Sequence, residues 1–157
     1  MTYASTIKCW LNQEEHFMGC FKASKLPAFP KSFPKSLIIN TEENEDVGHF
    51  VAVLLQKKYV IFFDSLGYKF LNVNIRLFLR KFYDKVYYYK FPLQHNLSLK
   101  CAHFCTIFVL RVKNMKDFQM YLNMFYKSNL QKNDYIIDFL IEMSQCKKLN
   151  INKPKNV

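Results

Sequence analysis

Glycine is scarce in this sequence, with only three among 157 residues, at positions 19, 48 and 67. A chain that uses glycine so sparingly keeps it where the backbone needs a positive φ or a close approach. Gly48 directly precedes His49, and Gly67 follows Asp64 by three residues. The two glycines therefore draw attention to one histidine and one aspartate.

Long apolar runs and regular cysteine patterns are also missing. No apolar run approaches the roughly 18 residues that a membrane span requires, and the N-terminus lacks the pattern of a signal peptide. The five cysteines, at positions 9, 20, 101, 105 and 146, show neither a disulfide framework nor zinc-ligand spacing. We therefore expect reduced thiols, no metal site, and a protein of the cytoplasm or nucleus that is not secreted.

Acidic residues are few beside basic ones, 12 against 23, which gives a net charge of +11. Such a surface attracts polyanions, nucleic acid among them. A coding sequence rich in A and T would also raise the content of Lys, Asn, Tyr and Phe, and this composition fits that origin too. No helix-turn-helix, finger or RNP-type pattern is present, so we do not expect sequence-specific recognition of DNA.

Half of the residues are hydrophobic, which predicts one compact domain over residues 1–157 with a frayed polar tail from about residue 147. The expected elements, in order, are a helix over 5–15, a proline-punctuated loop after Phe17–Phe21, a strand at 37–39, an exposed acidic turn over 41–46, a hairpin of 50–55 with 59–63, a helix over 72–83, a core strand over 86–91, a helix from Cys101, and helices over 116–126 and 133–143. This order predicts an α+β domain, with a small mixed or antiparallel sheet flanked by helices.

Cys101 stands where a polar segment gives way to an apolar helical pattern. Cys101, Cys105 and Phe108 share one face of that helix. In the first turn, unpaired backbone N–H groups and the helix dipole favour negative charge, and hence a thiolate nucleophile. The alternative is that both cysteines are small apolar residues of a core helix.

Three further residues complete a possible catalytic set. His49 begins the first hairpin strand and Asp64 closes the second, so the two lie at one edge of the sheet. An aspartate beside a histidine fixes its tautomer and stabilises its cation, and the histidine then exchanges protons with a cysteine. Gln94, seven residues before Cys101, is placed to donate to an oxyanion together with the Cys101 backbone N–H.

The order of these motifs resembles that of the adenovirus-type (adenain-like) cysteine endopeptidases of DNA viruses and virus-like transposons, which share a fold with the SUMO and ubiquitin-like proteases. The resemblance runs from about residue 17 to residue 110, over the segments Phe17–Phe21, Leu37–Thr41, Gly48–Ala52, Phe62–Gly67 and Gln94–Cys105. It implies a papain-like triad geometry with the nucleophile at the N-terminus of a core helix. By the same match, Cys101 is the nucleophile, His49 the general acid and base, Asp64 the orienting acid, and Gln94 the oxyanion residue.

Two positions depart from the family pattern. Phe50 replaces the usual Trp after the histidine, which keeps an aromatic wall of the site but loses the indole N–H. Ala102 replaces the usual Gly after the nucleophile, and its methyl group narrows the site.

The resemblance also implies a function. Such thiol proteases are late viral proteins that cleave viral precursor proteins during virion maturation, often after small residues such as Gly. They act as monomers in the host nucleus or cytoplasm and in the virion, without a required cofactor. Some are stimulated by viral DNA and by a short basic peptide; the charge of +11 is compatible with DNA, and nothing in the sequence points to the peptide.

Two alternatives stay open. The same triad and fold would serve a protease that removes ubiquitin-like modifiers, although the short chain leaves few segments for docking a modifier. A non-catalytic basic DNA-binding or virion protein with this fold is the other, and the complete set of catalytic residue types argues against it.

Overall fold

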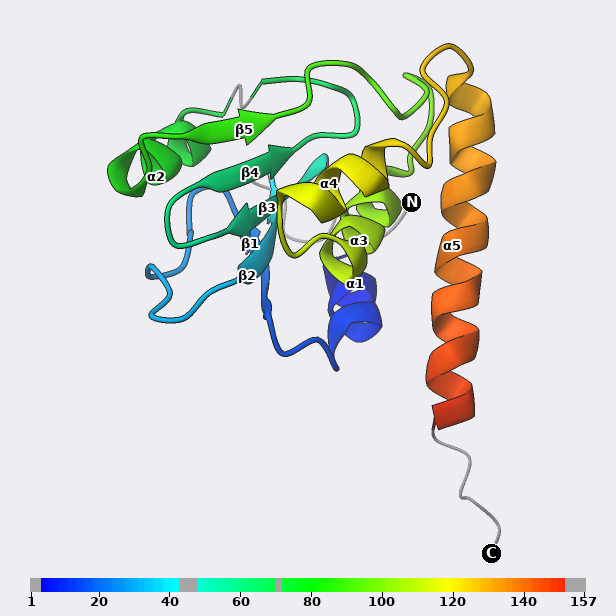
Figure 1. Cartoon of the computed structure of the whole chain (residues 1–157), viewed down its shortest axis with the longest axis horizontal. Helices are drawn as coiled ribbons and strands as arrows, with labels where there is room; N and C mark the ends of the chain where they lie inside the picture. The colour runs from blue at the N-terminus through cyan, green and yellow to red at the C-terminus, as the bar shows by residue number, and fades with distance from the viewer. Residues whose placement is uncertain (1–3, 43–47, 70–71, 152–157) are drawn as a thin grey trace, which may run out of the picture.

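The computed structural model describes residues 4–42, 48–69 and 72–151, with the backbone alone for 146–151. Its helices are α1 (Ala4–Leu11), α2 (Val73–Phe82), α3 (Cys101–Arg111), α4 (Met115–Leu122) and α5 (Leu130–Ile151). Its strands are β1 (Phe17–Lys22), β2 (Lys35–Asn40), β3 (Phe50–Leu55), β4 (Val60–Phe63) and β5 (Val86–Tyr88). The predicted α+β class is confirmed (Figure 1).

The five strands form one mixed sheet in the order β1-β2-β3-β4-β5. The central strands β2, β3 and β4 are antiparallel, and each edge strand is parallel to its neighbour. The three central strands are almost wholly buried, because runs of Val, Ile, Leu and Phe point to both faces of the sheet.

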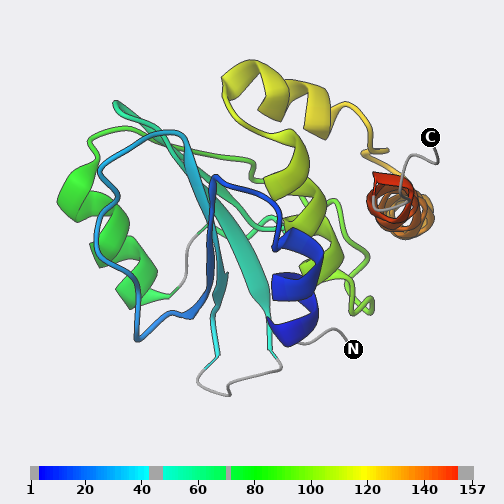
Figure 2. The ribbon, with the colours of Figure 1, turned by 90° about the horizontal axis from the view of Figure 1, so that it is seen from below.

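Helices cover both faces of the sheet (Figure 2). On one face, α2 packs Ile75 and Leu79 against side chains such as Val51 and Phe62. On the other face, α3 with α1 and α4 forms the larger core, in which the rings of Phe63 and Phe108 stack at 5.1 Å. Helix α3 is therefore buried between the sheet and α5, as its apolar sequence requires.

Several sequence-based expectations are confirmed and others need correction. The hairpin lies at Phe50–Leu55 and Val60–Phe63, and Asn72 caps α2 through its side chain. Residues 17–22 form an unforeseen strand, β1, because their partner is the parallel strand β2. The strand expected over 86–91 ends at Tyr88 and lies largely exposed at the sheet edge.

The C-terminal helices also differ from expectation. Helix α4 ends at Leu122, and α5 begins at Leu130 rather than beside Asn133. Helical backbone continues to Ile151, so the tail expected to fray from about residue 147 belongs to α5 up to that point. None of the helices among the described residues is long and apolar enough to cross a membrane.

Candidate active site

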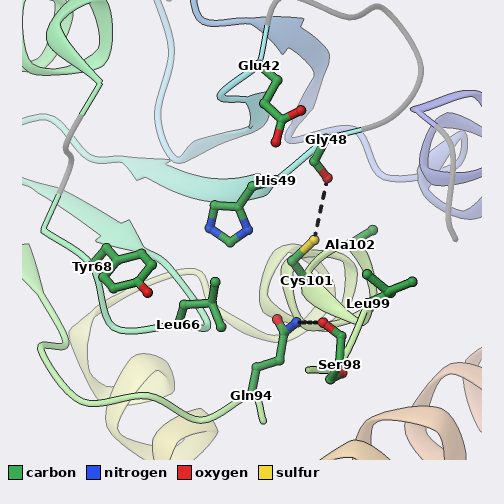
Figure 3. Close-up of a pocket in the computed structure, with 10 residues that line it drawn as sticks. All are labelled: Glu42, Gly48, His49, Leu66, Tyr68, Gln94, Ser98, Leu99, Cys101 and Ala102. Carbon is green, nitrogen blue, oxygen red and sulfur yellow. Dashed lines mark hydrogen bonds between the residues drawn. The ribbon is translucent and has the colours of Figure 1, made fainter. Parts of the chain in front are cut away.

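A cleft of about 470 Å³ opens at the N-terminal end of α3 (Figure 3). Three of the four predicted catalytic residues, His49, Gln94 and Cys101, line it. The fourth, Asp64, contacts His49 from an adjoining smaller cavity. The full lining consists of Glu42, Gly48, His49, Leu66, Tyr68, Gln94, Ser98, Leu99, Cys101 and Ala102.

His49 and Asp64 are brought together by the register of the β3–β4 hairpin. Ala52 lies opposite Phe63, and the same register carried one step further puts Asp64 opposite Val51. His49 is two residues from Val51 and so lies on the same side of the strand, diagonal to Asp64. Nε2 of His49 donates to Oδ1 of Asp64 at 2.9 Å.

Asp64 is held by its own turn. Its Oδ1 also accepts the backbone N–H of Leu66 at 2.9 Å, and its carbonyl oxygen accepts from Gly67 at 2.9 Å. The side chain is only 5% exposed. The carboxylate is therefore held by its own turn as well as by His49.

The charge state of His49 is set by its burial and by its two neighbours, Asp64 and Cys101. Burial lowers the pKa of His49, but the hydrogen bond to Asp64 and the interaction with the Cys101 sulfur together raise that pKa to about 10. The ring is consequently an imidazolium at neutral pH. Cys101 is the neighbour whose sulfur contributes to this shift, so the ring and the sulfur lie within interaction distance.

Cys101 is the first residue of α3 and is 8% exposed. Its Sγ lies 3.9 Å from the carbonyl oxygen of Gly48, the residue before His49. The helix N-cap, Lys100, makes no side-chain capping hydrogen bond. The first backbone N–H groups of a helix have no acceptor within it, so those at Cys101 and Ala102 remain for an anion in the cleft.

Gln94 is 2% exposed and is held at both ends of its amide. Its Oε1 accepts from Oγ of Ser65 at 2.6 Å, and its Nε2 donates to the carbonyl oxygen of Ser98 at 2.7 Å. An amide nitrogen carries two protons, so one N–H is left to donate into the cleft. Ser65 was not predicted, although its position directly after Asp64 was the available signal.

The other described cysteines have surroundings different from those of Cys101. Burial raises the pKa of the Cys105 thiol well above its usual value, and its Sγ donates to the carbonyl oxygen of Phe50 at 3.3 Å. Burial also raises the pKa of Cys20 to about 11. Cys9 is exposed on α1. All four cysteines whose side chains the structure describes are free thiols.

Phe50 and Ala102, the two residues that depart from the adenain-like pattern, lie in different parts of the structure. Phe50 was expected as a wall of the site, but it is 1% exposed and belongs to the core between the sheet and α3. Its neighbour His49 faces the cleft and Phe50 turns inward, because successive side chains of a strand point to opposite sides. Ala102 does line the cleft, as expected.

Sequence reasoning missed most of the cleft walls. Leu66 and Leu99 provide apolar surface on opposite sides of Cys101, and Tyr68 lies beyond Leu66 (Figure 3). These residues lie in loops and carry no periodic signal. Of the acidic turn expected over 41–46, Glu42 lines the cleft, and residues 43–46 lie outside the described part of the chain.

At both Gly48 and Gly67, close neighbouring atoms leave no room for a side chain. A Cβ on Gly48 would lie 2.3 Å from Oδ1 of Asn40, and one on Gly67 would lie 2.6 Å from the backbone carbon of Phe91. Gly67 also has a φ of +76°, in the left-handed region. The scarcity of glycine in the sequence therefore did point to the loops that carry the site.

Among the described residues, no group of three or more His, Cys, Asp or Glu side chains is arranged to hold a metal ion. In comparisons with known proteins, no family model matches the chain, and no curated protein shows significant similarity to it.

Proposed function

We propose that this protein is a cysteine endopeptidase of the adenain-like type, with Cys101, His49 and Asp64 as its triad and a papain-like arrangement of these groups. The observation that carries the proposal is the hydrogen bond from Nε2 of His49 to Asp64, made beside a cleft whose floor holds Cys101 at the start of α3. Because Nε2 of His49 is hydrogen-bonded to Asp64, Nδ1 is the ring nitrogen that remains to exchange a proton with the Cys101 sulfur.

The reaction proceeds in two halves. The Cys101 thiolate adds to the scissile carbonyl carbon, and the resulting oxyanion accepts from the Cys101 backbone N–H and the second N–H of Gln94. His49 gives its proton to the leaving amine as the C–N bond breaks, which leaves a thioester. Water, deprotonated by His49, then attacks the thioester and releases the acid and the thiolate.

The substrates in this proposal are viral precursor proteins cleaved during virion maturation in the host cell or the particle. Apolar side chains of Leu66 and Leu99 and the methyl group of Ala102 restrict the cleft, which favours small residues at the scissile bond. The net charge of +11 supports viral DNA as a partner that concentrates enzyme and substrate. No cofactor takes part in the chemistry.

The experiment combines an alkylating probe with a cleavage assay. We expect iodoacetamide at pH 6 to label Cys101 ahead of the exposed Cys9, because the thiolate is the reactive form. Of the four cysteines whose side chains are described, only Cys101 lies beside the imidazolium of His49. His49→Ala should abolish this preference, and Cys9→Ser should leave it unchanged. Gly-Gly-type peptides should be cleaved by the wild-type protein and not by Cys101→Ser. Equal labelling of the cysteines without cleavage would contradict the enzyme proposal.

Two additions to the assay separate the alternatives. Faster cleavage of a ubiquitin-like fusion than of the peptides would favour a deconjugating protease, which the shared triad keeps as the second candidate. Binding to DNA that weakens with salt, without any cleavage, would favour the non-catalytic basic protein.

A further inference from the structure

Helix α5 has buried residues on one side and two exposed aromatic side chains on the opposite side. On the inner side, Ile137 and Ile141 are buried against the core. Asn133, also buried, donates from Nδ2 to the carbonyl oxygens of Leu93 and Tyr126 at 2.9 and 2.7 Å. The helix is thus fixed to the domain by its inner side, beside α3 (Figure 1).

The outer side of α5 presents large apolar groups to solvent. Tyr135 is 77% exposed and Phe139 is 59% exposed. Lys132 and Glu142 are exposed on the same side, one before and one after the aromatic pair. We call Lys132, Tyr135, Phe139 and Glu142 the outer seam. At about 100° per residue, the outer seam lies opposite the buried residues 133, 137 and 141.

The spacing of the outer seam is that of a helix-pairing surface. Its four positions are separated by three, four and three residues, the a and d spacing of a coiled coil. Two exposed aromatic side chains one turn apart form an apolar patch of the kind that a partner covers. Figure 2, which looks along α5, shows no other helix or strand of the described chain on the side away from α3.

The order of residues along the outer seam selects its partner. In a two-fold antiparallel pair of identical helices, residue i meets residue j of the other copy, and j meets i. Lys132 and Glu142 are centred on position 137, and so are Tyr135 and Phe139. One antiparallel alignment therefore places each Lys132 against a Glu142 and each Tyr135 against a Phe139. The two Tyr135–Phe139 layers then lie between two end layers, each of which pairs one Lys132 with one Glu142.

We propose that the outer seam of α5 is a self-association surface, on which a second copy of this chain pairs antiparallel through Tyr135–Phe139 and Lys132–Glu142 contacts. Charge complementarity favours a second copy over an unrelated partner, because Lys132 and Glu142 of one outer seam face Glu142 and Lys132 of an antiparallel copy. Nζ of Lys132 lies 5.3 Å from the centroid of the Tyr126 ring, an exposed contact that Lys132 would exchange for Glu142 of the second copy. This proposal differs from the monomer that the family resemblance implies, and it is independent of the proposed chemistry.

The test is sedimentation velocity across a concentration series of the full chain. Wild-type protein should approach twice the monomer mass as concentration rises. Because the interface is symmetric, Lys132→Glu puts like charges in both end layers and should weaken association at least about tenfold, as should Glu142→Lys. An equimolar mixture of these two variants should form a heterodimer, because both end layers are then Glu against Lys. Phe139→Ser should be monomeric.

Lys116→Glu is the matched control, since it makes the same charge change at an exposed position on α4 and should leave association unchanged. Circular dichroism establishes that each variant is folded. A wild-type protein that stays monomeric at every concentration would overturn the proposal. A dimer that ignores both charge reversals, or variants that fail to associate on mixing, would overturn it too.

Discussion

Nε2 of His49 and Oδ1 of Asp64 lie 2.9 Å apart, and Asp64 is bonded at the same oxygen by the backbone N–H of Leu66. The aspartate is therefore fixed by the turn that follows β4, and the histidine is held against it by the β3–β4 register. The hairpin therefore sets the orientation of the ring, while Cys101, the proposed nucleophile, belongs to a different element, α3.

Asp64→Asn tests the orienting role. The amide keeps the size of the side chain but no longer stabilises an imidazolium, so the pKa of His49 should fall and the ring should lose its fixed tautomer. We expect kcat to drop by about 100-fold with little change in thermal stability. Peptide cleavage and NMR titration of the ring measure the two effects. Asp84→Asn, at an exposed position, is the control and should match wild type in both.

The raised pKa of His49, about 10, predicts an alkaline limit to activity. His49 must be protonated to release the leaving amine, so kcat/KM should fall as the pH rises through about 10. Asp64→Asn removes an interaction that raises this pKa, so the fall should move to lower pH in that variant. A pH profile of kcat/KM over pH 7–11 for both proteins is the measurement. An alkaline limb at the same pH in both would contradict the assignment of His49.

The sequence predicted the central hairpin and α2, because alternating and helical apolar patterns mark such elements directly. It also singled out His49, Gln94 and Cys101, which the structure brings to one cleft. It did not predict that Phe50 turns into the core, although strand alternation beside His49 implies it. Strand β1 was missed because its residues are all half-buried and its pairing with β2 is non-local. Leu66, Tyr68 and Leu99 were missed because loops have no period. Their place in the cleft follows only from the tertiary fold.

Ser65→Ala tests whether Gln94 is positioned by its buried partner. The substitution removes the 2.6 Å hydrogen bond from Oγ of Ser65 to Oε1 of Gln94 and leaves that oxygen unsatisfied. We expect kcat to fall about tenfold with KM unchanged, because the oxyanion that Gln94 is proposed to bind forms only in the transition state. Gln94→Ala should cost about 100-fold in kcat, and adding Ser65→Ala to it should cost little more. Additive losses would show that Ser65 acts independently of Gln94.

Gly67→Ala tests the turn that places Asp64. A methyl group at this position meets the backbone carbon of Phe91 at 2.6 Å, and the φ of +76° disfavours any residue with a Cβ. Strain and overpacking together should lower the free energy of unfolding by about 2–4 kcal/mol. Urea denaturation measures this loss, and Asn96→Ala, on an exposed loop, should change stability by less than about 0.5 kcal/mol. Because Phe91 precedes the loop that carries Gln94, the folded Gly67→Ala protein should also lose activity. A variant as stable as wild type would mean that the 91–92 backbone moves away freely and does not fix the turn.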